Sequence, residues 1–243
     1  MNRDRIFWIV AVAILVAYFM LRGDILSFGI TIIALLIAVT VHECAHAWTA
    51  DYLGDPTARL LGRVSLNPLV HLDPLGTVMM LITALTGFGI GWGKPVPVTP
   101  YRLRYGARRG TALVALSGPA SNLAAAILLG LVARFVQGVA GPQGVWLYRV
   151  LQIIVLTNIV IAMFNLLPLP PLDGHSVLIG LLSFSRSRWA WQATEFIYSL
   201  QRYGPMLLFG LILISQFFGF NLIGRLIGGP SFLIFRAIMG RLV

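Results

Sequence analysis

Long apolar runs separated by short polar stretches form the dominant pattern of the chain. A helix needs about 20 apolar residues to cross the hydrocarbon core of a bilayer. On this basis the pattern predicts five membrane-spanning helices, at 6–22, 25–53, 111–134, 148–174 and 203–224. A cleaved signal peptide is the alternative for the first run, but no small-residue cleavage site follows it. The tail mixes Arg225, Arg236 and Arg241 with bulky apolar residues, which predicts a C-terminal amphipathic helix.

One further apolar run differs from these five. The stretch from Pro74 to Gly93 contains no charged residue, yet glycine occupies alternate positions at its end (Gly87, Gly89, Gly91 and Gly93). Alternating glycine favours extended backbone over helix. We therefore expect 74–98 to be a re-entrant extended segment or β-hairpin that does not cross the membrane. The fold class is then an all-α polytopic membrane protein, with 1–243 forming a single membrane-embedded domain.

Composition supports a membrane protein and excludes two other classes. Of the 243 residues, 58% are hydrophobic and 11% are charged, whereas soluble domains carry about 25% charged residues. Disordered chains are rich in charge, so they are excluded by the same figures. The net charge of +10 fits basic loops beside anionic lipid headgroups. Because the arginines are scattered, we expect no nucleic-acid partner.

The clearest chemical motif lies inside the second run. His42-Glu43-Cys44-Ala45-His46 places two imidazoles four residues apart, on one face of a helix. This HExxH spacing binds one zinc ion and brings the glutamate to the water as a general base. Ionisable residues within a span are costly, which favours a functional role over chance. We read Cys44 as a packing residue.

A catalytic zinc site needs a third protein ligand. The candidates are the remaining histidines and the carboxylates, namely His71, His175, Asp24, Asp51, Asp55, Asp73, Asp173 and Glu195. Asp173 stands out because it follows a proline-interrupted span end, where irregular backbone can line a cavity. The alternative is that Asp173 caps a helix beginning at His175. The chain pattern alone leaves both open.

Three motifs together resemble the site-2 protease family of intramembrane metalloproteases. They are HECAH, the stretch from Asn165 to Gly174 (NLLPLPPLDG), and Ser117 to Asn122 (SGPASN). Gly91 to Pro97 (GWGKPVP) also resembles the extended segment of compact prokaryotic members. The resemblance implies one Zn²⁺ per chain, with His42, His46 and Asp173 as ligands, Glu43 as the catalytic base and Asn165 assisting at the reacting carbonyl. It further implies a compact member without a PDZ or nucleotide-binding domain.

The metal site and the number of spans constrain each other. Basic residues between 55 and 109 place this stretch on the inner side of the membrane. Asp173 then returns to the level of His42 and His46 only if 74–93 does not cross. A full crossing would put Asp173 about 30 Å away.

The expected function is therefore an intramembrane zinc endopeptidase that cleaves transmembrane proteins or peptides. We expect a multi-pass protein of a prokaryotic inner membrane, in contact with lipid, with the active site nearer the cytoplasm. The part of the extended segment from Gly87 to Val98 could hold an unwound substrate by strand addition. A metal-ion transporter or another membrane metallohydrolase is the alternative. His71 is read as a hydrogen-bonded loop histidine, and Trp92, Lys94 and Tyr101 as interface residues.

Overall fold

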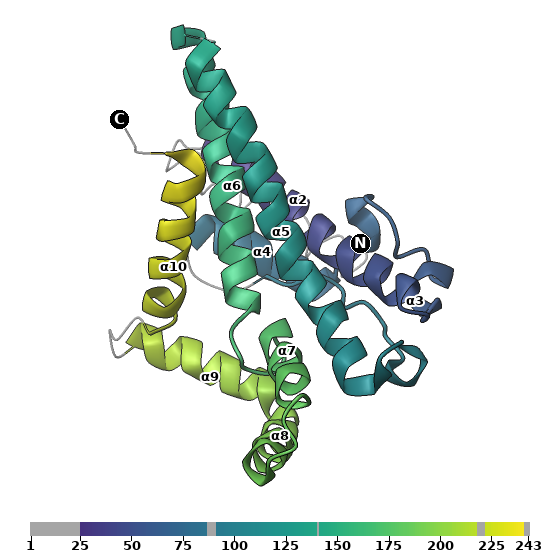
Figure 1. Ribbon diagram of the computed structural model, residues 1–243. Helices are drawn as coiled ribbons and strands as arrows, with labels where there is room; N and C mark the ends of the chain where they lie inside the picture. The colour runs from purple at the N-terminus through teal and green to yellow at the C-terminus, as the bar shows by residue number, and fades with distance from the viewer. Residues whose placement is uncertain (1–24, 87–90, 140, 218–221, 241–243) are drawn as a thin grey trace, which may run out of the picture.

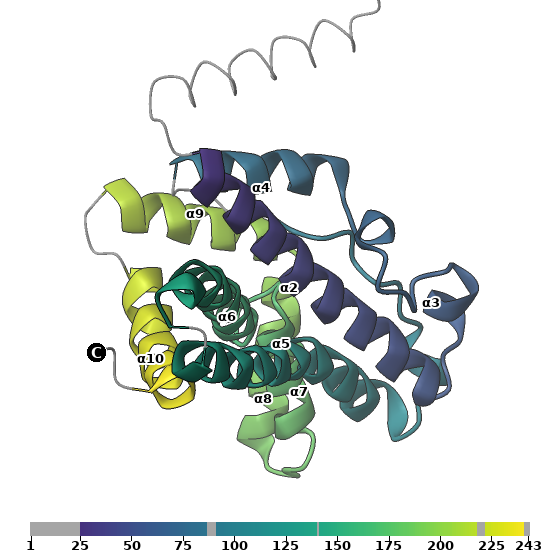
Figure 2. The same ribbon diagram turned by 90° about the horizontal axis from the view of Figure 1, so that it is seen from above.

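The computed structural model describes residues 25–86, 91–139, 141–217 and 222–240. This part of the chain is helical, with short connecting segments (Figures 1 and 2). The α-helices, in chain order, are α2 (Ile25–Tyr52), α3 (Thr57–Leu60), α4 (Pro74–Thr86), α5 (Gly106–Val139), α6 (Val145–Asn165), α7 (Asp173–Leu182), α8 (Arg188–Gln201), α9 (Gly204–Phe217) and α10 (Leu222–Met239). Three short 3₁₀ helices lie at Pro68–Val70, Pro100–Arg102 and Gly141–Gly144.

The centre of the fold is the pair α5 and α6, which lie side by side along most of their length (Figure 1). Helix α2 packs on both of them, and α7 packs on α5. Small side chains on α5, including Ala126 and Ala133, are fully buried against Val155 and Ile159 of α6. In a bilayer, helices associate through close packing of small residues, so these alanines allow the two backbones to approach.

Helix α10 packs along α6 and α5 (Figure 1). Its buried residues recur every four positions, at Ile227, Ser231, Phe235 and Met239. Phe235 and Met239 belong to the same apolar cluster as the α5–α6 core. The sequence correctly predicts an amphipathic helix here, and its apolar face covers neighbouring helices.

The prediction of extended backbone throughout 74–98 is wrong for its first half, because Pro74–Thr86 forms helix α4. Asp73 begins this helix: its Oδ1 accepts a hydrogen bond from the backbone N–H of Gly76 at 2.8 Å, as an N-cap does. Pro74 follows at a position that proline favours. The alternating glycines start only at Gly87, so they could not argue against a helix before it. No β-hairpin forms among the described residues of this segment.

The two ends of this segment nevertheless meet. Leu72 and Gly93 form an isolated antiparallel bridge, and the N–H of Lys94 donates to the carbonyl of His71 at 2.7 Å. A chain that leaves and returns at paired residues begins and ends at one level. Helix α4 is also too short to cross, since its 13 residues span about 20 Å against a core of about 30 Å.

Three described helices, α2, α5 and α6, are long and apolar enough to cross a membrane. Helices α8 and α9 give a fourth candidate as a single broken span, with a bend of 80° between them. The predicted first span, 6–22, lies outside the described residues. The predicted last span, 203–224, is described only in part: α9 ends at Phe217, and α10 begins at Leu222. The protein is therefore an integral membrane protein with at least three candidate spans.

Candidate metal centre

Three of the residues singled out by the sequence converge in space. His42 and His46 lie on one face of α2, and Asp173 is the first residue of α7. Oδ2 of Asp173 lies 3.1 Å from Nε2 of His42 and 3.3 Å from Nε2 of His46. One ligand atom from each residue falls within 4.8 Å of the other two. Both histidines are buried, and the carboxylate is largely so.

The hydrogen bonds around these residues leave three acceptors facing one another. Nδ1 of His46 donates to the carbonyl of Val114 at 2.7 Å, and Nδ1 of His42 lies 2.7 Å from Oδ1 of Asn122. With Nδ1 carrying the proton, each neutral imidazole presents a lone pair at Nε2. Oδ2 of Asp173 is buried and has no hydrogen-bond partner. A cation bound between these three atoms would accept their lone pairs.

Two of the three separations between ligand atoms are compatible with a zinc site. Zinc bonds to imidazole nitrogen and carboxylate oxygen are about 2.0 to 2.2 Å long, so neighbouring ligands of a tetrahedral site lie about 3.3 Å apart. The two separations measured here, 3.1 and 3.3 Å, match that edge. Two histidines and one carboxylate also form a known catalytic zinc set, which leaves one position open.

A buried carboxamide pair supports the first histidine from behind. Asn122 donates from Nδ2 to the carbonyl of Ala38 and to Oδ1 of Asn158, each at 2.9 Å. Asn158 in turn donates to the carbonyl of Ile154. These bonds orient Oδ1 of Asn122 toward His42 and join α2, α5 and α6. The sequence analysis included Asn122 only as part of a motif and missed Asn158, which the cost of burying an amide in a span could have revealed.

Two glycines bring neighbouring backbones up to the site. A Cβ on Gly118 of α5 would lie 2.4 Å from Nε2 of His46, so only glycine lets α5 pass beside the imidazoles. A Cβ on Gly174 would lie 2.3 Å from the carbonyl oxygen of Leu166. The absence of a side chain there lets α7 start close to the end of α6, and this holds Asp173 at the histidines.

The alternative interpretation of Asp173 as a helix cap is wrong. The cap position of α7 is Leu172, and no side chain makes a capping hydrogen bond there. Asp173 is the first helical residue, and its carboxylate points to the histidines instead.

The other candidate ligands lie elsewhere. Asp51 pairs with Arg59, and Asp73 caps α4. His71 is fully buried, with Nε2 donating to the carbonyl of Ser65, and His175 bonds the carbonyl of Leu172. Asp55 belongs to the polar cluster described below, Glu195 lies on α8, and Asp24 falls outside the described residues. Cys44 is partly buried and is not part of the metal group.

Glu43 faces the segment Gly91–Val98, which follows α4 and pairs with Leu72 through Gly93. We call this segment the extended limb. A Cβ on Gly93 would lie 3.1 Å from Oε1 of Glu43 and 2.8 Å from a methyl carbon of Val39. The extended backbone of Gly93 thus passes directly over the carboxylate, next to the metal ligands. Asn165 ends α6, and its amide donates to the carbonyl of Ile161 at 3.0 Å, within its own helix. None of the described hydrogen bonds joins Asn165 to the three ligands.

A polar cluster outside the spans anchors the far end of the extended limb. Asp55 is fully buried between α2 and α3. Its carboxylate accepts from the hydroxyl of Thr57 and from the N–H of Thr99, both at 2.5 Å. Burial raises the pKa of Asp55, but these hydrogen bonds and nearby Arg102 outweigh it, so the pKa lies below its ordinary value.

Comparison with known proteins agrees with this site. Residues 141–209 match the model of peptidase family M50. "Putative zinc metalloprotease YwhC" of Bacillus subtilis (strain 168) is 39% identical over 155 residues, which cover 62% of this chain and 68% of YwhC. "Putative zinc metalloprotease Rip2" of Mycolicibacterium smegmatis is 32% identical over 154 residues, and the match spans only 56% of its length. No solved structure matches the chain significantly.

The chain therefore belongs to peptidase family M50, the family of the site-2 proteases. It is a zinc metalloprotease, and it carries a His–His–Asp group suited to that metal.

Proposed function

We propose that the protein is an intramembrane endopeptidase in which His42, His46 and Asp173 hold one zinc ion. The observation that carries this proposal is the convergence of three acceptor atoms, including the unpartnered Oδ2 of Asp173, inside a helical bundle. Zinc bound there supplies Lewis-acid polarisation of a peptide carbonyl and lowers the pKa of a water molecule.

Glu43 and Asn165 act on the peptide bond in this proposal. Glu43 takes a proton from the attacking water and passes it to the leaving nitrogen. Asn165 gives up its hydrogen bond to Ile161 and donates to the oxygen of the reacting carbonyl. The position of Asn165 at the last residue of α6, eight residues before Asp173, supports this assignment.

The extended limb Gly91–Val98 receives the substrate. A transmembrane helix satisfies its own backbone groups, so it must unwind before a carbonyl becomes available. Unwound chain can add as a strand to an extended edge. The passage of Gly93 over Glu43 supports this limb as that edge, because a strand paired there lies beside the catalytic base.

We also propose a five-span topology with the site toward the cytoplasm of a prokaryotic inner membrane. In this topology the segment 6–22 is the first span and the apolar run 203–224 is the last. The excess of basic residues between 55 and 109 supports the inward placement of that stretch.

The test uses full-length protein in proteoliposomes with a reconstituted single-span substrate. Wild type should cut the substrate within or next to its apolar segment, as mapped by mass spectrometry of the fragments. Glu43→Gln should keep its zinc and lose at least about 100-fold in rate, the size expected for a general base. Equal cleavage by both proteins would overturn the role of Glu43. Zinc uptake into the liposomes, unchanged in Glu43→Gln, would favour a transporter.

The extended limb has a test of its own. Gly93→Pro removes a backbone N–H from the limb, and it should abolish cleavage of the single-span substrate while zinc stays bound. Gly93→Ala is the matched control: it adds the same Cβ beside Glu43 and Val39 but keeps the N–H, so it should retain more activity than Gly93→Pro. Undiminished cleavage by Gly93→Pro would overturn strand addition at this limb.

A further inference from the structure

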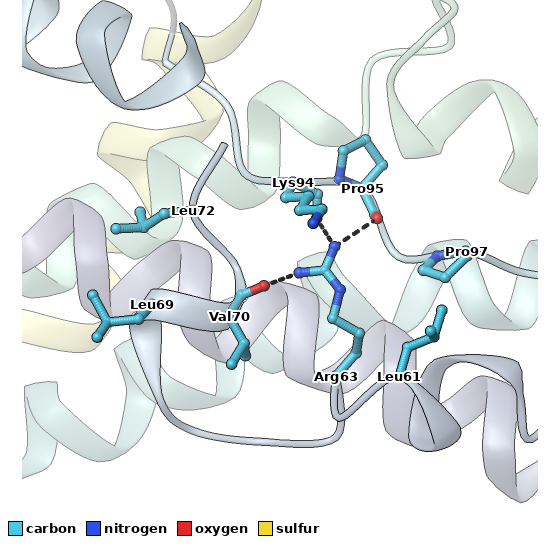
Figure 3. A pocket seen from close by; sticks show the side chains of 8 residues that line it. All are labelled: Leu61, Arg63, Leu69, Val70, Leu72, Lys94, Pro95 and Pro97. Atoms are coloured by element: carbon cyan, nitrogen blue, oxygen red, sulfur yellow. Dashed lines mark hydrogen bonds between the residues drawn. The ribbon is translucent and has the colours of Figure 1, made fainter. Parts of the chain in front are cut away.

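A second site lies outside the metal centre, between the loop after α3 and the extended limb. It is a pocket of about 450 Å³ (Figure 3). Two cationic side chains and six apolar ones line it: Arg63, Lys94, Leu61, Leu69, Val70, Leu72, Pro95 and Pro97. Lys94, Pro95 and Pro97 belong to the limb proposed to receive the substrate, and the other five residues lie outside that limb.

Arg63 is the structural centre of this pocket. Its side chain is buried, and its guanidinium donates to three backbone carbonyls. One belongs to Val70 on one wall, and two belong to Lys94 and Pro95 on the other, at 3.2 and 3.1 Å (Figure 3). These three carbonyls accept from only part of the five guanidinium N–H groups, and they do not neutralise the positive charge. A buried charge without a counter-ion is costly, so this position favours an anion.

The protein supplies no such anion in the part of the chain that is described. Neither Arg63 nor Lys94 forms an ion pair there. The carboxylates between positions 51 and 73 have other partners: Asp51 pairs with Arg59, Asp55 with Thr57 and Thr99, and Asp73 with the N–H of Gly76. Two cations therefore share one pocket that no acidic side chain lines.

The rim of the pocket is apolar and exposed. Leu61 and Leu69 line the pocket and are 63% and 73% exposed. A small soluble anion would gain nothing from these leucines. A ligand with an anionic head and hydrocarbon chains would cover them while its head neutralises the cations.

We propose that this pocket binds an anionic phospholipid, with its phosphate between Arg63 and Lys94 and an acyl chain along Leu61 and Leu69. The protein resides in a bilayer, which supplies this ligand. Binding would also bridge the two walls that Arg63 joins, and so steady the extended limb that continues to Gly93 beside Glu43.

The experiment measures lipid retention by native mass spectrometry of full-length protein titrated with phosphatidylglycerol or phosphatidylcholine in detergent. Wild type should retain one phosphatidylglycerol in preference to phosphatidylcholine. Lys94→Gln should weaken this binding about fivefold, because one cation near a lipid surface contributes about 1 kcal/mol. Arg236→Gln on α10 removes the same charge away from the pocket, and it should bind as wild type does.

Two further experiments measure how much the apolar residues contribute to binding and whether the pocket prefers a lipid phosphate to free phosphate. Leu69→Ser should weaken phosphatidylglycerol binding without changing net charge, and inorganic phosphate alone should not displace the lipid. Equal binding of both lipids, or equal loss in Lys94→Gln and Arg236→Gln, would overturn the proposal. Displacement by inorganic phosphate would instead identify a simple phosphate site, and displacement by an acidic peptide would identify a peptide site. Because Lys94 is exposed, its variant should fold even where an Arg63 variant does not.

Discussion

Oδ1 of Asn122 lies 2.7 Å from Nδ1 of His42, so an amide on α5 fixes the orientation of an imidazole on α2. Such outer partners set the tautomer of a metal-binding histidine and typically contribute 10- to 100-fold to metal affinity. Asn122→Leu removes this acceptor and should weaken zinc binding by about that factor, as measured by competition with a chelator.

Asn158→Leu is the graded control for this variant. It removes one of the two bonds that hold the Asn122 amide, but it leaves the bond to Ala38. Zinc binding should therefore weaken less than in Asn122→Leu. Unchanged zinc affinity in Asn122→Leu would show that the amide does not position His42.

A substitution at Gly118 tests whether α5 must pass close to His42 and His46 for zinc to bind. In Gly118→Ala the new methyl group would sit 2.4 Å from Nε2 of His46, where a metal bond has to form. Zinc content, measured by elemental analysis of purified protein, should fall to a small fraction of wild type. Gly29→Ala on α2 has open space around it, and it should retain zinc and unfold at an equal or higher temperature. Full zinc content in Gly118→Ala would contradict the observed packing.

The lowered pKa of Asp55 predicts that the unfolding temperature of the protein falls at acid pH. Because its pKa is lower in the folded protein than the ordinary value of about 3.9, its contribution is present above that value. It is lost as the pH falls through the lower, folded pKa. Asp55→Asn places an amide where the N–H of Thr99 donates, so it should lower the unfolding temperature at pH 7 and flatten its dependence on acid pH.

The control for Asp55 is Asp51→Asn, which removes a partly exposed ion pair with Arg59. Exposed pairs contribute about 0 to 1 kcal/mol, so this change should be small. Thermal unfolding of both variants in detergent, from pH 7 down to about pH 3, makes the comparison. An identical pH profile for Asp55→Asn and wild type would contradict the role of this carboxylate.

The bridge between Leu72 and Gly93 predicts that the residues before and after 74–93 lie on the same side of the membrane. Leu66 and Tyr101 lie before and after this stretch, and both are exposed. In a Cys44→Ala background, cysteines at these two positions should react with a membrane-impermeant maleimide from the same side. Labelling from opposite sides would show that 74–93 crosses the membrane.

The helices of the bundle core could be predicted from the sequence, because spans depend on length and hydropathy alone. The run 25–53 matches α2 (Ile25–Tyr52) almost residue for residue. Helix α5 begins at Gly106, earlier than the predicted 111, because its first turn carries Arg108 and Arg109, which a hydropathy pattern assigns to a loop. Helix α4 was missed because a glycine pattern at one end was extended over the whole run.

The metal group could also be predicted, because HExxH is a local motif and the resemblance to site-2 proteases implies Asp173 as the third ligand. The tertiary contacts could not be predicted in this way. These contacts join residues that are far apart in the chain. Examples are Gly93 over Glu43, Arg63 with the carbonyl of Lys94, and Asn158 with Asn122. No local period encodes such pairs.

The most direct test of the account is the zinc content of two variants, measured per chain in purified full-length protein. Glu43→Gln should retain one zinc, because the proposal makes Glu43 the base and not a ligand. Asp173→Ala should lose most of the metal, because it removes one of three ligands. Zinc retained at the wild-type level by Asp173→Ala, or lost from a folded Glu43→Gln, would contradict the assignment of His42, His46 and Asp173 as the site.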